Sequence, residues 1–315
     1  MKDRALVNAV FNGDASYGAP VTAYYHFGQQ YQEGDVHADL EVAYYERFRP
    51  DILKVMNDYS FPCPDGMTRL TSPGDIDAYA HSTAHRQPFP EQLKALSSVR
   101  QQLGQAPVIW DTVFNPWFAI RRNLLCLDIE TYMREEPARL HQLLEIVADA
   151  IAGHIVSSLA AGADGILYSV PASEHFLSRT DFRTFMLPYD LKVIEQVKRH
   201  TDMFVVHIHG AGTIYHEDVF THYPHDGLSW ADRTTNLSLT DARRKSDTVL
   251  MGGIDETNDF NYRPYDVFEA EMREAVQAMA GTPFILSPGC VLPPQCPTER
   301  LAFMFETARA LRSKH

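Results

Sequence analysis

The stretch GADGILYSVPASEHFLSRTDFRTFMLPYDLKVIEQVKRHTDMFVVHIHG, residues 162–210, contains an apolar run, a helical pattern and a second apolar run in succession. The apolar runs at 162–170 and 203–210 predict buried strands, and the segment 180–199 between them predicts a helix. Strands that are joined through a helix run parallel to each other. The stretch therefore predicts a strand–helix–strand unit of an α/β sheet.

The same alternation continues in both directions along the chain. Including the two strands above, the predicted strands are 20–28, 51–58, 106–114, 162–170, 203–210, 227–232, 247–255 and 282–289. The clearest predicted helices are 135–161, 180–199, 263–280 and 297–313, and a short amphipathic helix is expected near the N-terminus. Apolar strands that alternate with helices favour a parallel sheet covered by helices, and eight of them are enough to close a (β/α)8 barrel.

We therefore predict an α/β fold: a single (β/α)8 TIM-barrel domain over residues 1–315, which includes an N-terminal extension. No repeat or Pro/Gly/Ser-rich linker divides the chain. A doubly wound open sheet is the alternative. It is disfavoured because the first predicted strand is not followed by G-x-G-x-x-G, and FNGDASYG (11–18) does not match that dinucleotide-binding pattern.

Composition excludes several classes of partner. The 315 residues include 41 acids and 28 bases, a formal charge of −13, whereas nucleic-acid binding requires clustered Lys and Arg. No apolar run approaches the roughly 18 residues that a membrane span needs. The first residues lack the pattern of a secretory signal. We expect a cytoplasmic protein that binds a small molecule and neither nucleic acid nor membrane.

Two histidines in FVVHIHG (204–210) indicate a metal site. His207 and His209 are two residues apart, so on a strand their side chains point to the same face. Cys290 follows the last predicted strand, and the carboxyl ends of the strands carry the active site of a barrel. Two histidines and one cysteine suit Zn²⁺, and three protein ligands leave a position open for catalysis. The alternative is a pair of core histidines bonded to backbone or solvent, with Cys290 as a small buried apolar residue.

Other polar and aromatic residues also fall where predicted strands end. Asp255 and Asp111 are candidates for a general base or for orienting a ligand histidine. Capping of a helix or a solvated loop would explain Asp111 equally well. The predicted substrate-binding residues are Tyr168, Trp230, His26 and Asn115. For the aromatic residues the alternative is ordinary packing, and His26 could belong to the core.

Several motifs resemble those of the uroporphyrinogen decarboxylase superfamily. They are YYERFRPDILKVMNDY (44–59), residues 162–198, FVVHIHG (204–210), LMGGID (250–255) and FILSPGCVLPPQCPTERLAFMFETAR (284–309). The resemblance implies a (β/α)8 barrel. One branch of the superfamily contains the metal-free decarboxylases, whose N-terminal arginines hold the substrate carboxylates. Here no arginine lies between Arg4 and Arg47.

The other branch contains zinc-dependent methyltransferases that move a methyl group between a corrinoid protein and a thiol. Their ligand pattern places the first histidine on His207 and the distant cysteine on Cys290, and this chain has His209 where that branch has cysteine. The resemblance thus implies a zinc-dependent methyltransferase whose metal activates the acceptor, with a corrinoid protein or a small methylated molecule as donor. The alternatives are a decarboxylase, for which Arg121 and Arg122 are the remaining candidates to bind carboxylates, and a non-enzymatic carrier or sensor of a corrinoid or porphyrin.

Overall fold

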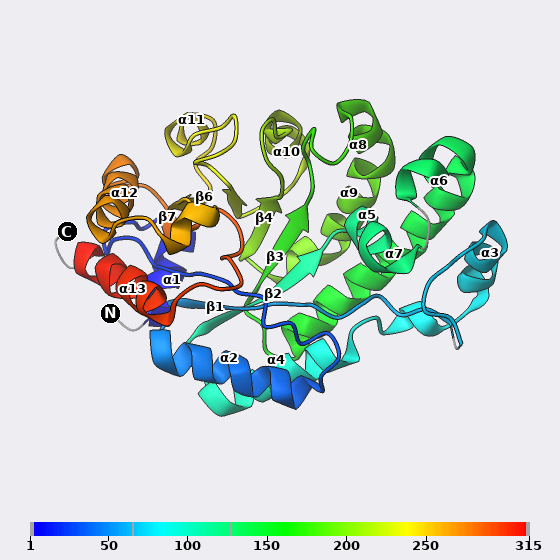
Figure 1. Cartoon of the computed structure of the whole chain (residues 1–315), viewed down its shortest axis with the longest axis horizontal. Helices are drawn as coiled ribbons and strands as arrows, with labels where there is room; N and C mark the ends of the chain where they lie inside the picture. Colours follow the sequence, from blue (N-terminus) through cyan, green and yellow to red (C-terminus); the bar gives the residue numbers. More distant parts are fainter. Residues whose placement is uncertain (1–2, 65, 126–127, 313–315) are drawn as a thin grey trace.

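Parallel strands form one curved sheet in a computed structural model that describes residues 3–64, 66–125 and 128–312 (Figure 1). Within these residues the strands are β1 Ile52–Val55, β2 Val108–Phe114, β3 Gly165–Val170, β4 Phe204–Ile208, β5 Gly227–Trp230, β6 Val249–Ile254 and β7 Phe284–Pro288. They are hydrogen-bonded in chain order from β1 to β7, and every pairing is parallel. A doubly wound sheet reverses its strand order at a switch point, so that alternative is wrong. The fold is TIM-barrel-like, with a seven-stranded sheet in the described residues.

The predicted first strand, 20–28, is reduced to one bridge between β7 and the start of β1. Val21 pairs with Leu286, and the Thr22 N–H donates to the Leu286 carbonyl at 3.2 Å. On the β1 side, side chains take over two ladder positions. The Asp51 carboxylate accepts from the Val21 N–H at 2.7 Å, and the Thr22 hydroxyl donates to the Ile52 carbonyl at 2.7 Å. One backbone bond remains on this side, from the Asp51 N–H to the Val21 carbonyl at 2.9 Å. The prediction of a full strand here is wrong, because pairing is limited to the residues around Val21.

The helices cover the outside of the curved sheet (Figure 1). In the described residues they are α1 Asp3–Phe11, α2 Gly34–Phe48, α3 Pro73–His81, α4 Pro90–Leu103, α5 Pro116–Ala119, α6 Ile129–Glu135, α7 Pro137–Ala160, α8 Arg179–Phe185, α9 Leu187–Val197, α10 His216–His222, α11 Leu239–Arg243, α12 Tyr265–Ala278 and α13 Thr298–Arg312. The predictions at 135–161, 263–280 and 297–313 are confirmed as α7, α12 and α13. The helix predicted at 180–199 is divided at Met186. Pro188 lacks an N–H and its ring clashes with a preceding carbonyl, so an uninterrupted helix is disfavoured there.

Helix α7 is long and apolar enough, by length and composition, to cross a membrane. The sequence-based expectation that no segment reaches this length is therefore wrong. More than half of its most apolar 18-residue stretch is buried, and the helix packs against β2, α3, α4 and α9. A helix that covers the face of a parallel sheet must be apolar over most of its surface. The packing therefore explains the composition of α7 as that of a core helix.

Helix α1, the N-terminal extension, covers the amino ends of the strands. Val7 and Val10 belong to the same buried apolar cluster as Ile52 and Val205, which lie inside the curved sheet. Arg4 anchors the helix through Asp164, at 2.7 Å between Nη1 and Oδ1. Because α1 occupies this end, the carboxyl ends of the strands remain as the open end of the sheet interior.

Candidate functional site

The structure brings the three predicted metal ligands together at the carboxyl ends of the strands. His207 lies on β4 and points into the sheet interior, His209 follows β4 directly, and Cys290 follows β7. One side-chain ligand atom of each residue lies within 4.8 Å of the other two. Cys290 Sγ is 3.5 Å from His209 Nδ1. We call these three residues the triad.

His207 has one ring nitrogen with a partner and one without. Its Nδ1 is 3.2 Å from Ser229 Oγ, and its buried Nε2 has no hydrogen-bond partner among the described residues. Only 3% of His207 is exposed. Burial lowers the pKa of His207 well below its usual value, and the charges of His209 and Lys54 add to the effect. The ring is therefore neutral, and an unpaired buried nitrogen of this kind requires an explanation such as a bound ion.

The other two members of the triad are also uncharged at neutral pH. Burial, followed by the charges of His175 and His26, lowers the pKa of His209 to about 4. Burial, followed by the charge of Glu256, raises the pKa of the Cys290 thiol to about 11. A coordinated cation would deprotonate this thiol, as metal ions do. Two neutral imidazoles and one sulfur therefore fit Zn²⁺ in donor type.

A cavity of about 290 Å³ opens beside the triad. All three triad residues contribute to its wall, so a bound ion would have an exposed side. The other lining residues are His175, Phe176, Ile208, Gly210, Ala211, Ala231, Thr234, Glu256 and Thr257. The arrangement can hold a small molecule against the metal-binding groups.

Comparison with known proteins places the chain in a family. Residues 15–311 match the sequence profile described as uroporphyrinogen decarboxylase (URO-D). The chain belongs to this family. It is 25% identical to a uroporphyrinogen decarboxylase of Gloeobacter violaceus, over 91% of this chain and 87% of the relative. It is 24% identical to a uroporphyrinogen decarboxylase of Picosynechococcus sp., over 91% and 86%.

Among solved structures, a methyltransferase from Methanosarcina mazei has a TM-score of 0.77 at 19% identity, covering 100% of this chain and 99% of the other. A putative vitamin-B12 independent methionine synthase from Listeria monocytogenes has a TM-score of 0.56 at 14% identity, covering 95% and 97%. These identities establish a shared fold and no more. The match to the uroporphyrinogen decarboxylase profile confirms the superfamily that was predicted from the sequence. The TIM-barrel-like fold of the chain agrees with it.

In this member of the family, Glu256 is the acid that lines the triad cavity. Burial, together with the charges of Asp255 and Asp232, raises the pKa of Glu256 to about 7 against backbone hydrogen bonds. Asp255, the predicted catalytic acid, instead pairs with Arg263 at 3.1 Å between Oδ2 and Nη2 and does not line the cavity. The structure thus places Glu256, the neighbour of the predicted Asp255, at the cavity wall.

A buried lysine lies inside the sheet near the triad and was missed by sequence analysis. Lys54 of β1 is 2% exposed, and its Nζ has no hydrogen-bond partner among the described residues. It lies 2.8 Å from the centre of the Tyr24 ring, which meets His207 edge to face at 6.2 Å between centroids. Burial lowers the pKa of Lys54 well below its usual value. The sequence signal was a lysine within the apolar strand ILKV.

His26 lies at a second cavity of about 360 Å³, whose wall also includes Asp58 and Arg122. His26 Nδ1 is 2.6 Å from Asp58 Oδ1, and Arg122 Nη2 is 3.5 Å from the same oxygen. Burial alone would raise the pKa of Asp58, but His26 and Arg122 together lower it below its usual value. His26 therefore keeps its predicted place at a cavity, separate from the triad.

Asp111 lies behind the sheet. Its neighbour Trp110 belongs to the interior cluster, so Asp111 points outward, toward α4 and α7. Its carboxylate accepts from Gln92 Nε2 at 2.8 Å and from Ser158 Oγ at 2.6 Å, and it lies 3.0 Å from His154 Nε2. The structure thus removes Asp111 from the candidate catalytic residues, because its contacts join β2 to two helices.

Three of the predicted substrate-binding residues also face the helices or loops outside the sheet. Asn115 Nδ2 donates to Asp190 Oδ1 at 3.1 Å, and the Tyr168 hydroxyl donates to the same oxygen at 2.8 Å. Trp230 is fully buried, and its Nε1 donates to the Leu237 carbonyl at 2.7 Å. Asn115, Tyr168 and Trp230 are thus removed from the predicted pocket. Their polar groups are already bonded within the protein.

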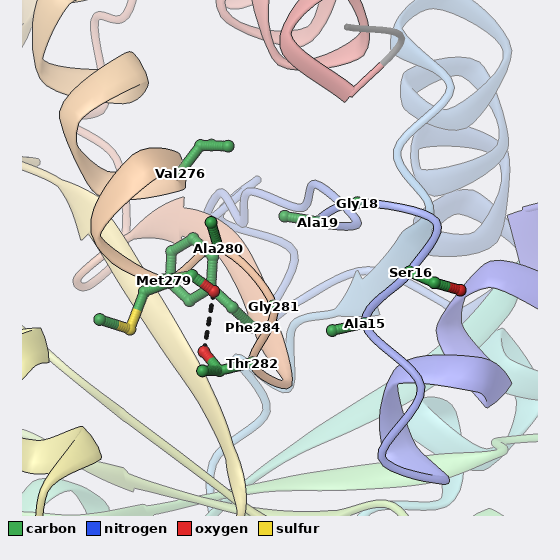
Figure 2. A pocket seen from close by; sticks show the side chains of 10 residues that line it. All are labelled: Ala15, Ser16, Gly18, Ala19, Val276, Met279, Ala280, Gly281, Thr282 and Phe284. Atoms are coloured by element: carbon green, nitrogen blue, oxygen red, sulfur yellow. Dashed lines mark hydrogen bonds between the residues drawn. The ribbon is translucent and has the colours of Figure 1, made fainter. Parts of the chain in front are cut away.

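A further cavity, of about 210 Å³, lies at the amino end of β7 (Figure 2). It is bounded by the segment 15–19 and the connection between α12 and β7. None of its lining residues has an ionisable side chain, and the Thr282 hydroxyl donates to the Met279 carbonyl at 2.8 Å. This cavity therefore lacks groups for acid, base or metal chemistry.

Proposed function

We propose that the protein is a zinc-dependent methyltransferase that transfers a methyl group from a corrinoid protein or a small methylated donor to an acceptor held beside the triad. The observation that carries this proposal is the convergence of His207, His209 and Cys290, with ligand atoms within 4.8 Å of one another, at the wall of a cavity. The unpartnered Nε2 of His207 supports it further.

His207, His209 and Cys290 would hold the ion, and Zn²⁺ would act as a Lewis acid that lowers the pKa of the acceptor. Ser229 fixes the ring of His207: a proton on Nδ1 donates to Ser229 Oγ and leaves Nε2 free as a ligand. The cavity wall beside His209 includes Phe176, 5.4 Å away between ring centroids, which limits access of water.

The second histidine distinguishes this chain from the His-x-Cys pattern of the methyltransferase branch that it resembles. A site with two imidazoles and one thiolate carries one negative charge fewer than a site with one imidazole and two thiolates. The ion is therefore more electrophilic and makes a bound sulfur less nucleophilic. We infer that the acceptor is not restricted to a thiol.

The metal content of the protein tests the proposal. The full chain is purified without added metal, and native mass spectrometry measures zinc before and after addition of Zn²⁺. We expect close to one zinc per chain. A content near zero that does not rise on addition would exclude a zinc enzyme.

Decarboxylation of a tetrapyrrole or a smaller carboxylated ring is the second candidate. It is favoured by the names of the two cyanobacterial relatives and by Arg122, a cation at the wall of the second cavity. Incubation with uroporphyrinogen, followed by chromatography for coproporphyrinogen, tests it directly. Product formation by metal-free protein would replace the methyltransferase proposal with this one.

A further inference from the structure

Glu256 is a partly buried acid at the cavity wall, and the described part of the protein supplies no cation to it. None of the residues that line the triad cavity is a lysine or arginine. No basic side chain in the described part of the chain forms an ion pair with Glu256, and its pKa is raised by burial and by neighbouring acids. A partly buried carboxylate without a cation is stabilised either by taking up a proton or by a cationic group from outside the protein.

The acids around Glu256 differ from it in that each lies close to an arginine. Asp255 pairs with Arg263 at 3.1 Å, and Glu271 makes an ion pair with the same arginine. Asp232 lies 3.6 Å from Arg233 Nε. Three of the acids at this end of the sheet thus form ion pairs with arginines, whereas Glu256 forms none in the described residues and contributes to the cavity wall.

The Glu256 carboxylate accepts hydrogen bonds from the backbone of Glu256 and Gly289. A Cβ atom on Gly289 would lie 2.8 Å from Glu256 Oε2 and 2.6 Å from the Ala231 Cα, so only glycine fits at this position. Gly289 immediately precedes Cys290, so the residue next to the Glu256 carboxylate is the chain neighbour of a triad member. Glu256 lies outside the cluster whose ligand atoms are within 4.8 Å of one another, but it contributes to the wall of the same cavity.

We propose that Glu256 determines the class of substrate: it selects a molecule with a cationic or N–H donor group, such as a protonated amine or amidinium, and rejects carboxylates. The inference rests on the proposed function, in that the selected molecule is the one held beside the triad. A carboxylate in such a site attracts a cation and repels an anion, and each effect is strengthened where water is excluded.

Acetamidinium and acetate test the inference, because they have nearly the same shape and opposite charge. Calorimetry measures the affinity of the zinc-treated full chain for each probe. We expect acetamidinium to bind at least about tenfold more tightly than acetate, and Glu256→Gln to reduce this ratio by at least about tenfold. Asp255→Asn is the matched control: it removes the same charge one residue away, outside the cavity, and should leave the ratio unchanged.

Two outcomes would overturn the inference. The first is a wild-type preference that is absent or that persists in Glu256→Gln. The second is a loss of zinc in Glu256→Gln as large as that in His207→Ala, which would make Glu256 a metal ligand. Zinc content is measured on the same samples. If the protein binds no zinc but its acetamidinium-to-acetate affinity ratio still falls in Glu256→Gln, the zinc-dependent methyltransferase is disproved. The selectivity assigned to Glu256 then stands.

Discussion

Two buried polar regions lie on opposite faces of the sheet and differ in how their polar atoms are satisfied. Behind the sheet, the Asp190 carboxylate accepts from Tyr168, Tyr223 and Asn115 at 2.7 to 3.2 Å. Inside the sheet, His207 is equally buried, but its Nε2 has no hydrogen-bond partner in the described residues. The first region is complete without a ligand, whereas the second is not.

The difference teaches how to separate structural from functional polar residues when both are buried. A satisfied carboxylate joins elements of the fold, and its removal leaves several donors unpaired. An unpaired nitrogen close to a second imidazole and a thiol indicates a missing ligand. Substitutions in the Asp190 region should therefore change stability, and substitutions in the triad should change metal binding.

The largest effect is expected at Asp190. Asp190→Ala leaves the Tyr168 and Tyr223 hydroxyls and the Asn115 amide without an acceptor, and should lower the free energy of unfolding by about 3–5 kcal/mol. Asp190→Asn keeps an oxygen acceptor and should cost much less. Urea denaturation measures both variants, and zinc content per folded molecule should not change. A loss below about 1 kcal/mol in Asp190→Ala would place this region outside the stabilising core.

The next effect is on metal affinity. His207→Ala and His209→Ala each remove one of three protein ligands, and each should weaken zinc binding by at least about 100-fold. Both variants should keep the circular dichroism spectrum of the wild type, because His209 lies at the cavity wall and the ring nitrogens of His207 make one hydrogen-bonding contact in the described residues, with Ser229. His175→Ala is the control, because His175 lines the same cavity without belonging to the triad. Unfolding of either triad variant would show that these histidines are structural.

The pH dependence of zinc affinity distinguishes the members of the triad. Burial lowers the pKa of His209 to about 4, so its imidazole is neutral and competent to bind metal at any pH well above 4. An imidazole with an ordinary pKa would lose metal below about pH 6. Because His209 stays neutral there, the pH dependence of zinc affinity should instead be set by the Cys290 thiol.

The Cys290 thiol has a pKa of about 11, so zinc must displace its proton at all lower pH values. Affinity should therefore fall about tenfold for each pH unit of acidification, and the slope should steepen only near the pKa of His209. Competition with a chromophoric chelator between about pH 6 and about pH 9 measures the slope. Cys290→Ala should flatten it. A wild-type affinity independent of pH would remove Cys290 from the ligand set.

The smallest effect concerns alkylation of Cys290. Removal of zinc exposes the sulfur, but burial keeps the free thiol protonated at neutral pH. Chelation should therefore raise iodoacetamide labelling only a few-fold near pH 7 and more strongly near pH 9. Peptide mapping compares Cys290 with Cys63 and Cys296, whose labelling should not respond to the chelator. Cys126 lies outside the described residues, and labelling of Cys290 that ignores the chelator at both pH values would contradict its role as ligand.

The sequence by itself determined the strand–helix alternation, the superfamily and the three members of the triad. Seven of the eight predicted strands are present in the described residues, because runs such as FVVHI and VLMGGI are predominantly apolar. The i, i+2 spacing of His207 and His209 was sufficient to place both on one face, and the position of Cys290 after the last strand placed it at the same end. Cytoplasmic location and the corrinoid partner stay predictions.

Only the tertiary structure decided which side chains face the interior. A strand that is buried on both faces is apolar at nearly every position, so its sequence does not show which residues point inward. Asp111 and Tyr168 were therefore predicted at the pocket, although they point to the helices behind the sheet. The choice between Asp255 and Glu256 depended on the backbone after β6 ends at Ile254, where strand alternation no longer applies. Asp255 pairs with Arg263, whereas Glu256 lines the cavity. Both arrangements depend on packing between segments that are separate in the chain.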